Sequence, residues 1–477
     1  MTEYDRYSSP LADRYASAAM LELWSPRTRY GLWRRLWLAL AESEQELGVA
    51  IPPEAITQMR DRLDDIDFYA VAAYERRFRH DVVAHIHAFG DAAPAAKPFI
   101  HLGATSAFVT DNADLILMRR GLDVLRGKIL QIMRSLAAFA REWRDEPALG
   151  YTHLQPAQLT TVGKRATLWL QDLVLDLNDL DHRRATLPFR GVKGTTGTQA
   201  SFLEIFQGDH KKVRELERRV TARMDFPAAL GVTGQTYTRK LDAWVLGVVT
   251  GIAASAGKFS GDIRMLQTFG ELEEPFERDQ VGSSAMAYKR NPMRAERIAS
   301  LARFVISLES NAQHTHSVQF LERTLDDSAN RRIVLPEAFL ATDAILLLMG
   351  NIVTGMEIYP KQIRRRIDRE LPFMATEELI VRAVRAGRDR QVAHEVIRKH
   401  SLDAARAMKE GADANDMLER LAADPEYGVP MDDLRGALAP ERFVGRAPQQ
   451  VDDFLAEVVE PLLAGAAPPT PTDEIRV

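Results

Sequence analysis

The sequence of 477 residues contains no cysteine. This absence excludes disulfide bridges, thiolate nucleophiles and zinc sites built from sulfur ligands. An excess of charge of one sign is also lacking, because 62 basic and 67 acidic residues leave a formal net charge of −5. Such a balanced chain has no general attraction to nucleic acid or to anionic membranes. Any site for an anion must therefore be local.

Long uncharged stretches are also scarce. The most notable stretch, residues 243–257, is shorter than the roughly 18–20 residues that cross a bilayer. The amino terminus is polar and lacks the apolar core of a signal peptide. With 46% hydrophobic residues the composition is that of a globular protein. We therefore expect a cytoplasmic protein, with a length that allows about three domains.

Apolar spacing predicts a mostly helical chain. Apolar residues recur every three or four positions over 29–47 and 54–68, and a further helix is expected over 70–89. The last of these would carry His80 and His87 on one face. Two histidines at this spacing suggest a metal site, but the face offers no third ligand, so we do not expect one.

The middle of the chain predicts long antiparallel helices, because three windows between prolines each exceed forty residues: 99–146, 228–274 and 293–335. In the second window, apolar and small residues between Leu241 and Leu266 cover most of the helix circumference. A helix of this kind is packed on all sides. We expect it to be surrounded by neighbouring subunits, the alternative being the interior of a monomeric bundle.

Two polar segments interrupt these helices and are candidates for a functional site. Residues 151–158 contain a proline and His153, and predict a non-helical bend with either a functional or a structural histidine. Residues 322–332 place arginines around Ser328, which suits a phosphate group. The alternative is a loop whose arginines pair with its own aspartates.

A third segment, 280–297, joins mobile backbone to the start of a helix. Gly282 and two serines favour a flexible loop, and Asn291 followed by Pro292 predicts a helix N-cap with proline in the first turn. Hydroxyls, the Lys289 amine and free helix N–H groups would then share a small volume that suits negative charge. The alternative is an ordinary surface loop.

The same segment resembles the signature loop of the fumarase/aspartase superfamily of lyases, Gly-Ser-Ser-x-Met-Pro-x-Lys-x-Asn-Pro. Ala287 stands where the superfamily has proline, and the matching positions are Gly282, Ser283, Ser284, Met286, Lys289, Asn291 and Pro292. The substitution removes no functional group and affects only the expected rigidity of the loop.

Further blocks make the chain resemble one family of this superfamily, the animal-like adenylosuccinate lyases. The blocks are 79–85, 101–106, 150–165, 190–202 and 322–332. The resemblance implies an enzyme of purine biosynthesis that cleaves adenylosuccinate to AMP, and the succinylated aminoimidazole carboxamide ribotide (SAICAR) to AICAR, with release of fumarate from each. It implies neither a metal nor an organic cofactor.

The resemblance also assigns residues. Ser283 would be the base, His153 the acid, His80 an assistant in placement and proton handling, and Lys289 a partner of the substrate carboxylates. The other residues that it places at the substrate are Arg14, Tyr15, Arg79, Asp81, His101, Thr105, Ser106, Thr152, Gln235, Asn291, Arg297, Arg323, Ser328 and Arg332. Among these, Arg14, Tyr15, Arg323, Ser328 and Arg332 would bind the 5′-phosphate.

The implied architecture is an all-α fold of three domains with a long central bundle shared in a homotetramer. We expect domains at 1–105, 106–358 and 359–477, active sites shared between subunits, and a disordered tail from about residue 464. The rival interpretations are another lyase of the superfamily, such as argininosuccinate lyase, and a non-catalytic helical oligomer.

Overall fold

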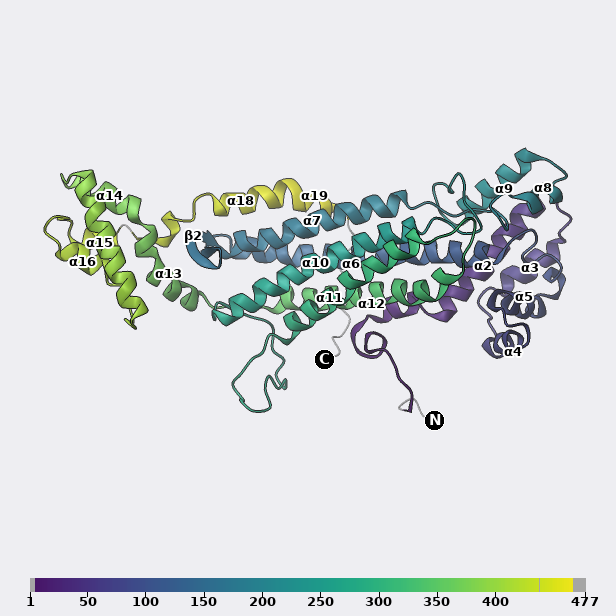
Figure 1. Cartoon of the computed structure of the whole chain (residues 1–477), viewed down its shortest axis with the longest axis horizontal. Helices are drawn as coiled ribbons and strands as arrows, with labels where there is room; N and C mark the ends of the chain where they lie inside the picture. The colour runs from purple at the N-terminus through teal and green to yellow at the C-terminus, as the bar shows by residue number, and fades with distance from the viewer. Residues whose placement is uncertain (1–4, 437, 466–477) are drawn as a thin grey trace.

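The computed structural model describes residues 5–436 and 438–465 as an elongated helical bundle (Figure 1). Long helices run along its axis: α6 (Ser106–Glu142), α7 (Val162–Thr186), α10 (Lys240–Thr268), α11 (Met293–Ser317) and α12 (Asp326–Gly355). With 37 residues, α6 alone extends about 55 Å. The predicted all-α fold with a long central bundle is confirmed.

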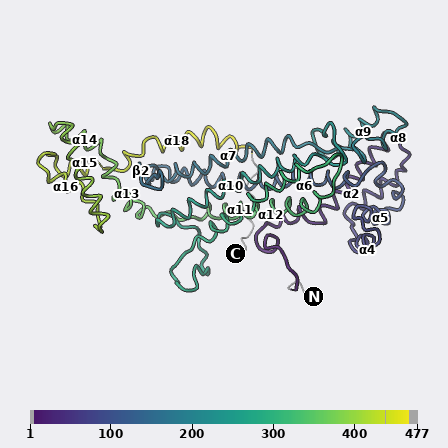
Figure 2. The backbone as a smooth tube through the Cα atoms, in the orientation of Figure 1, coloured from purple at the N-terminus to yellow at the C-terminus, as the bar shows by residue number. Residues whose placement is uncertain are grey.

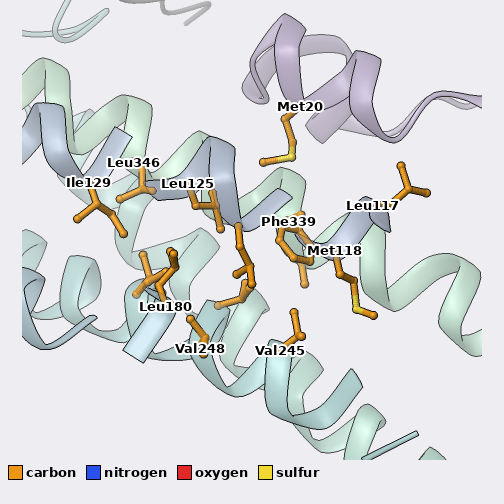
Figure 3. Packing of buried hydrophobic residues seen from close by; sticks show 14 of the residues in the cluster. Met20, Leu117, Met118, Leu125, Ile129, Leu180, Val245, Val248, Phe339 and Leu346 are labelled. Carbon is orange, nitrogen blue, oxygen red and sulfur yellow. The ribbon is translucent and has the colours of Figure 1, made fainter. Parts of the chain in front are cut away.

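Apolar side chains from these helices form one continuous core. Figure 3 shows Met20, Leu125, Leu180, Val248 and Phe339 converging from different helices. Gly121 on α6 allows close approach, since a Cβ there would meet the Phe339 ring. Within this single chain α10 buries 15 of its 29 residues, while Trp244 and Met265 on the same helix are exposed.

Shorter helices cover one end of the bundle, where Figures 1 and 2 show α2 to α5 beside α8 and α9. Serine and aspartate side chains cap several of them; Ser25, for example, accepts a hydrogen bond from the Thr28 N–H at the start of α2. The elements at this end are α2 (Pro26–Glu46), α3 (Pro53–Asp61), α4 (Phe68–Phe78), α5 (Asp81–Ala92), the 3₁₀ turn η3 (Pro94–Ala96), α8 (Ala200–Ile205) and α9 (His210–Arg223). Before them in the chain, the π-helical turn η2 (Leu11–Tyr15) and α1 (Ala18–Leu23) pack against α12.

The opposite end carries a helical group with its own apolar cluster, which includes Leu379, Ile397 and Leu421. From there the chain returns along α7, where α18 packs (Figure 1). The elements are α13 (Pro360–Met374), α14 (Thr376–Arg385), α15 (Arg390–Lys409), α16 (Met417–Ala423), α17 (Met431–Arg435), η4 (Pro440–Arg442), α18 (Ala447–Phe454), η5 (Leu455–Val459) and α19 (Glu460–Ala464). The rest of the predicted disordered tail, residues 466–477, lies outside the described residues.

Two small antiparallel sheets join the helices. β1 (Pro147–Thr152) and β2 (Gln155–Thr161) form a hairpin, and β3 (Leu272–Glu273) pairs with β4 (Glu357–Ile358). The non-helical bend predicted at 151–158 is present. Its hairpin geometry was not predicted, because the flanking residues alternate over too few positions to distinguish strand from loop.

Several predicted helix boundaries are wrong. Helix α3 ends at Asp61 rather than near Phe68, and the helix expected over 70–89 is divided into α4 and α5 at Arg79, which has a φ of 54°. The window 293–335 contains a break between α11 and α12, and α12 continues through Pro336. A proline removes one backbone hydrogen bond but does not end a helix whose surroundings bury it.

Length alone does not exclude membrane spans here. Both α10 and α12 are long and apolar enough to cross a bilayer, contrary to the estimate from residues 243–257. Their apolar windows are 61% and 78% buried inside the chain, respectively. These two helices therefore form the core of the bundle.

Glu44 gives a stability prediction, because its carboxylate is fully buried on α2 and has no hydrogen-bond partner among the described residues. Burial raises its pKa to about 9. The folded state then keeps a proton that the unfolded state releases above its ordinary pKa, so stability falls as pH rises between these two values. We expect Glu44→Gln to be near-neutral at about pH 4 and stabilising by about 1–3 kcal/mol at about pH 8.

Urea unfolding at both pH values measures this difference. The exposed Glu22→Gln on α1 is the control and should show no such pH-dependent gain. A Glu44→Gln variant that is equally or less stable at the higher pH would contradict the prediction.

Candidate active site

The signature loop lies between β3 and α11 and extends away from the bundle (Figure 1). Gly282 packs against Lys289 so closely that a Cβ would overlap the lysine carbonyl oxygen. Ser283 Oγ accepts hydrogen bonds from the N–H groups of Ala285, at 3.3 Å, and Met286, at 3.1 Å. The loop therefore surrounds the serine oxygen with backbone donors.

The predicted N-cap at Asn291 is wrong. Pro292 occupies the cap position of α11, and the Asn291 amide donates instead to the Gly282 carbonyl at 2.7 Å. The buried Glu274 carboxylate takes over the capping role, because its two oxygens accept from the N–H groups of Arg294, at 2.9 Å, and Ala295, at 3.1 Å. A distant carboxylate cannot be inferred from local cap patterns. Burial raises the pKa of Glu274 in spite of these donors.

His153 lies in the turn of the β1–β2 hairpin and is exposed. Both central turn residues have positive φ, 53° for His153 and 60° for Leu154. This is the geometry of a two-residue type I′ turn, which normally favours asparagine or glycine. Non-glycine residues are strained in this conformation, so the flanking strands must hold the turn.

A second group of predicted residues meets where α5, α6 and α12 begin. His80 caps α5 and its Nε2 lies 3.5 Å from Ser106 Oγ. Asp81 forms an ion pair of 2.9 Å with Arg332. Thr105, the N-cap residue of α6, makes no side-chain cap hydrogen bond within the described chain, which leaves the helix N–H groups available to an anion.

His101 completes this group and is held by the Trp37 indole N–H, which donates to its Nδ1 at 2.8 Å. Burial, and secondarily the nearby His80, lower the pKa of His101 to about 4. His101 is therefore neutral at physiological pH and accepts a hydrogen bond on one nitrogen. His87, the other residue of the suggested metal pair, stacks instead on Tyr74 and Phe78.

The arginines of 322–332 divide between two roles. Arg323 pairs with Asp327 at 3.0 Å, as the salt-bridged alternative expected, while Arg332 is largely exposed. Arg331 is buried and forms ion pairs with Asp242, at 2.7 Å, and Asp114, at 3.0 Å.

Arg239 extends this buried network, with ion pairs of 2.7 Å to Asp327 and 3.1 Å to Asp111. Burial raises the pKa of Asp111, but the guanidinium groups of Arg239 and Arg331 outweigh it and hold the pKa below its usual value. The network fixes the starts of α6, α10 and α12 relative to one another. Sequence reasoning did not predict it, since its members are far apart in the chain.

Gln235 and Ser328 lie at the end of the bundle where α6, α10 and α12 begin. The Gln235 side chain donates to the Thr195 carbonyl at 3.0 Å, and its backbone N–H donates to the Glu322 carbonyl at 2.9 Å. Ser328 lies in the first turn of α12. The glycine-rich segment 191–201 therefore packs beside the arginine segment.

The amino-terminal arm joins a different part of the molecule. The Arg297 guanidinium on α11 lies 5.0 Å from the centre of the Tyr15 ring, and Arg14 beside it is exposed. Asp343, fully buried on α12, anchors the arm by accepting from the Ser17 N–H at 2.7 Å.

One chain does not bring the predicted residues together. The hairpin with Thr152 and His153 lies at the end near α13, whereas α5, which follows Arg79 and His80, lies at the opposite end (Figures 1 and 2). The signature loop projects from the bundle at a third place (Figure 1).

Comparison with known proteins identifies the family. A family model described as "Lyase" matches residues 51–307, and one described as "Adenylosuccinate lyase C-terminus" matches residues 372–454. The chain is 52% identical over 462 residues to the adenylosuccinate lyase of Saccharomyces cerevisiae, with 96% of each chain covered. The chain belongs to the adenylosuccinate lyase family. It is thus a carbon–nitrogen lyase.

Other relatives extend the same match. The adenylosuccinate lyases of Schizosaccharomyces pombe and Schistosoma mansoni are 51% and 46% identical to this chain, and each alignment covers 97% of both proteins. Among solved structures, a fumarate lyase from Mesorhizobium sp. BNC1 superposes with a TM-score of 0.78 at 22% identity, covering 95% of this chain and 100% of that one. This structural likeness shows the fold alone.

Two neighbouring arginines of this adenylosuccinate lyase family member are expected to differ in their contribution to stability. Arg331→Met should destabilise the protein by about 3–5 kcal/mol, because it removes a buried guanidinium from Asp242 and Asp114. Of these two partners Asp242 then keeps only the neutral Tyr237 hydroxyl, and Asp114 keeps Arg29. Arg332→Met removes only an exposed charge and should change stability by less than about 1 kcal/mol. Urea unfolding of both variants measures the contrast. Equal losses of stability in the two variants would show that the buried ion pairs of Arg331 do not stabilise the fold.

Proposed function

We propose that the chain cleaves adenylosuccinate to AMP and fumarate, and SAICAR to AICAR and fumarate, without a metal or organic cofactor. The observation that carries this proposal is identity of 52% to a named adenylosuccinate lyase over nearly the whole of both chains. The match to the C-terminal model of that family argues against argininosuccinate lyase.

The proposed reaction is a β-elimination. Ser283 removes a proton from the succinyl carbon beside a carboxylate, the electron pair forms the fumarate double bond, and the carbon–nitrogen bond breaks. His153 gives a proton to the departing nitrogen. The Lys289 cation, and hydrogen bonds from the Asn291 amide, stabilise the negative charge that builds up on the carboxylate.

Serine is a weak base, so its oxygen must be stabilised as an anion. The two N–H groups that donate to Ser283 Oγ supply part of this stabilisation, because they favour the charged form of the oxygen. Closure of the loop over the substrate would exclude water and strengthen these interactions.

The remaining predicted residues divide between two ends of the substrate. We propose that His80, His101, Thr105, Ser106 and Gln235 contact the succinyl group and base, with Arg79, Asp81 and Thr152 beside them. The 5′-phosphate would bind to Arg14, Tyr15, Arg323, Ser328 and Arg332, with Arg297 at its edge.

A single chain separates these groups, so we propose a cytoplasmic homotetramer whose active sites combine segments of different subunits. Exposed apolar side chains on the long helices support association. Leu175 on α7 is 59% exposed, Trp244 on α10 is 43% exposed and Ile306 on α11 is 45% exposed. Such residues on core helices are typical of a surface that another subunit covers. Within each subunit we retain domains at 1–105, 106–358 and 359–477.

Mixing two inactive variants tests the shared site. Ser283→Ala and His153→Ala should each lower fumarate release from adenylosuccinate by at least about 10²-fold, because each removes one proton-transfer group. Denaturing, mixing and refolding the two should restore activity, since hybrid tetramers contain sites with both groups intact. Absorbance of fumarate measures the rate, and size-exclusion chromatography checks the assembly.

The outcomes separate the parts of the proposal. No fumarate release by the wild-type protein would reject the activity, and near-normal release by Ser283→Ala would reject serine as the base. If the two variants form a stable mixed tetramer that shows no recovered activity, these residues are not shared between subunits.

Arg323→Ala tests the phosphate site. We expect affinity for AMP to fall by about tenfold or more, because a charged hydrogen bond to phosphate contributes about 1.5–3 kcal/mol. Isothermal titration with AMP measures the change, and Arg385→Ala on α14, an exposed arginine at the far end, is the control. Unchanged affinity would move the phosphate site elsewhere.

A further inference from the structure

The strands of the hairpin must hold His153, because its turn is strained and exposed. Tyr151 lies two residues before the histidine on β1 and is half-buried. Its ring stacks on Phe269 with centroids 5.3 Å apart. Its hydroxyl accepts from Arg366 Nη2 at 3.0 Å and lies 3.5 Å from Glu271 Oε1.

Glu271 is the centre of this cluster. Its side chain is 2% exposed and forms an ion pair of 2.9 Å with Arg366 on α13, while Arg165 on α7 lies at 3.9 Å. The Arg366 guanidinium also covers the Phe269 ring, at 4.2 Å from its centre. One buried carboxylate thus contacts the hairpin, a bundle helix and the C-terminal helical group.

Glu271 also lies at the base of the segment that leads to the signature loop. Glu271 directly precedes β3, and its carbonyl accepts from the Tyr359 N–H at 3.0 Å, beside β4. Beyond β3 the chain leaves the bundle towards Ser283 (Figure 1). The contacts of Glu271 therefore join the base of the signature loop to the hairpin that carries His153.

We propose that Tyr151, Arg366 and Glu271 are positioning residues for His153. They hold β1 so that the strained turn presents the imidazole in one orientation, and none of them needs to touch substrate. This inference rests on the proposed function, in which His153 protonates the departing nitrogen. A displacement of about 1 Å at such a group lowers turnover by up to about 10²-fold.

A double-mutant cycle tests this role. Tyr151→Phe keeps the ring stack and removes only the hydroxyl, so the fold should persist. We expect kcat to fall by about tenfold with KM within about twofold, because proton transfer is misaligned while binding is kept. In a His153→Gln background the same change should alter residual kcat by less than about twofold, since the group that it positions is gone.

Tyr427→Phe is the matched control. It removes a tyrosine hydroxyl that donates to the Leu379 carbonyl at 3.0 Å in the C-terminal group, away from the hairpin. It should change thermal stability about as much as Tyr151→Phe does and leave kcat unchanged. Arg366→Met is a second variant, expected to reproduce the kcat loss of Tyr151→Phe.

The outcomes distinguish this inference from the proposed function. Full activity of His153→Gln alone would reject His153 as the acid and with it the route by which Tyr151 acts. If His153→Gln is impaired but Tyr151→Phe lowers kcat equally in both backgrounds, or in neither, only the positioning role is overturned.

Discussion

The buried ion pairs at the starts of α6, α10 and α12 are the constraint on which the rest of the site depends. Arg239 and Arg331 lie among four aspartates, and removing one partner from a buried ion pair costs about 3–5 kcal/mol. Because the charges are divided among three helix starts, the network fixes those helix ends in one arrangement. The exposed faces of those ends then present Ser106, Ser328 and Arg332 in a fixed geometry.

Rigid helices of this length have a further consequence. A helix such as α6 places its two ends about 55 Å apart, so a group at one end cannot reach a group at the other by any modest motion. His80 and His153 are attached to opposite ends of such a bundle (Figure 1). The proposed shared site therefore requires a second copy whose hairpin end lies at the α5 end of the first. The exposed apolar side chains of α7, α10 and α11 are the surface that we propose for this contact.

How far the sequence predicts this structure depends on the range of the interactions. Local periodicity was sufficient for α2, because a buried face repeats along one segment. Windows free of proline were sufficient for α6 and α10. It failed at Arg79, where a left-handed residue divides a helix, and at Asn291, whose capping role is taken by Glu274 from across a loop. The separation of α11 from α12 was missed because no proline marks it, while Pro336 lies inside a helix.

The candidate site shows the same difference between local and long-range interactions. A family resemblance could name Ser283, His153 and Arg323 because each lies in a recognisable segment. It could not name Glu271 or Arg239, whose importance comes from partners up to 128 positions away, as between Arg239 and Asp111. Groups that touch substrate are found in short segments, whereas groups that orient them are found only in three dimensions. In the proposed mechanism His153 depends on this second class, because a strained turn needs its flanking strands to hold a side chain in one orientation.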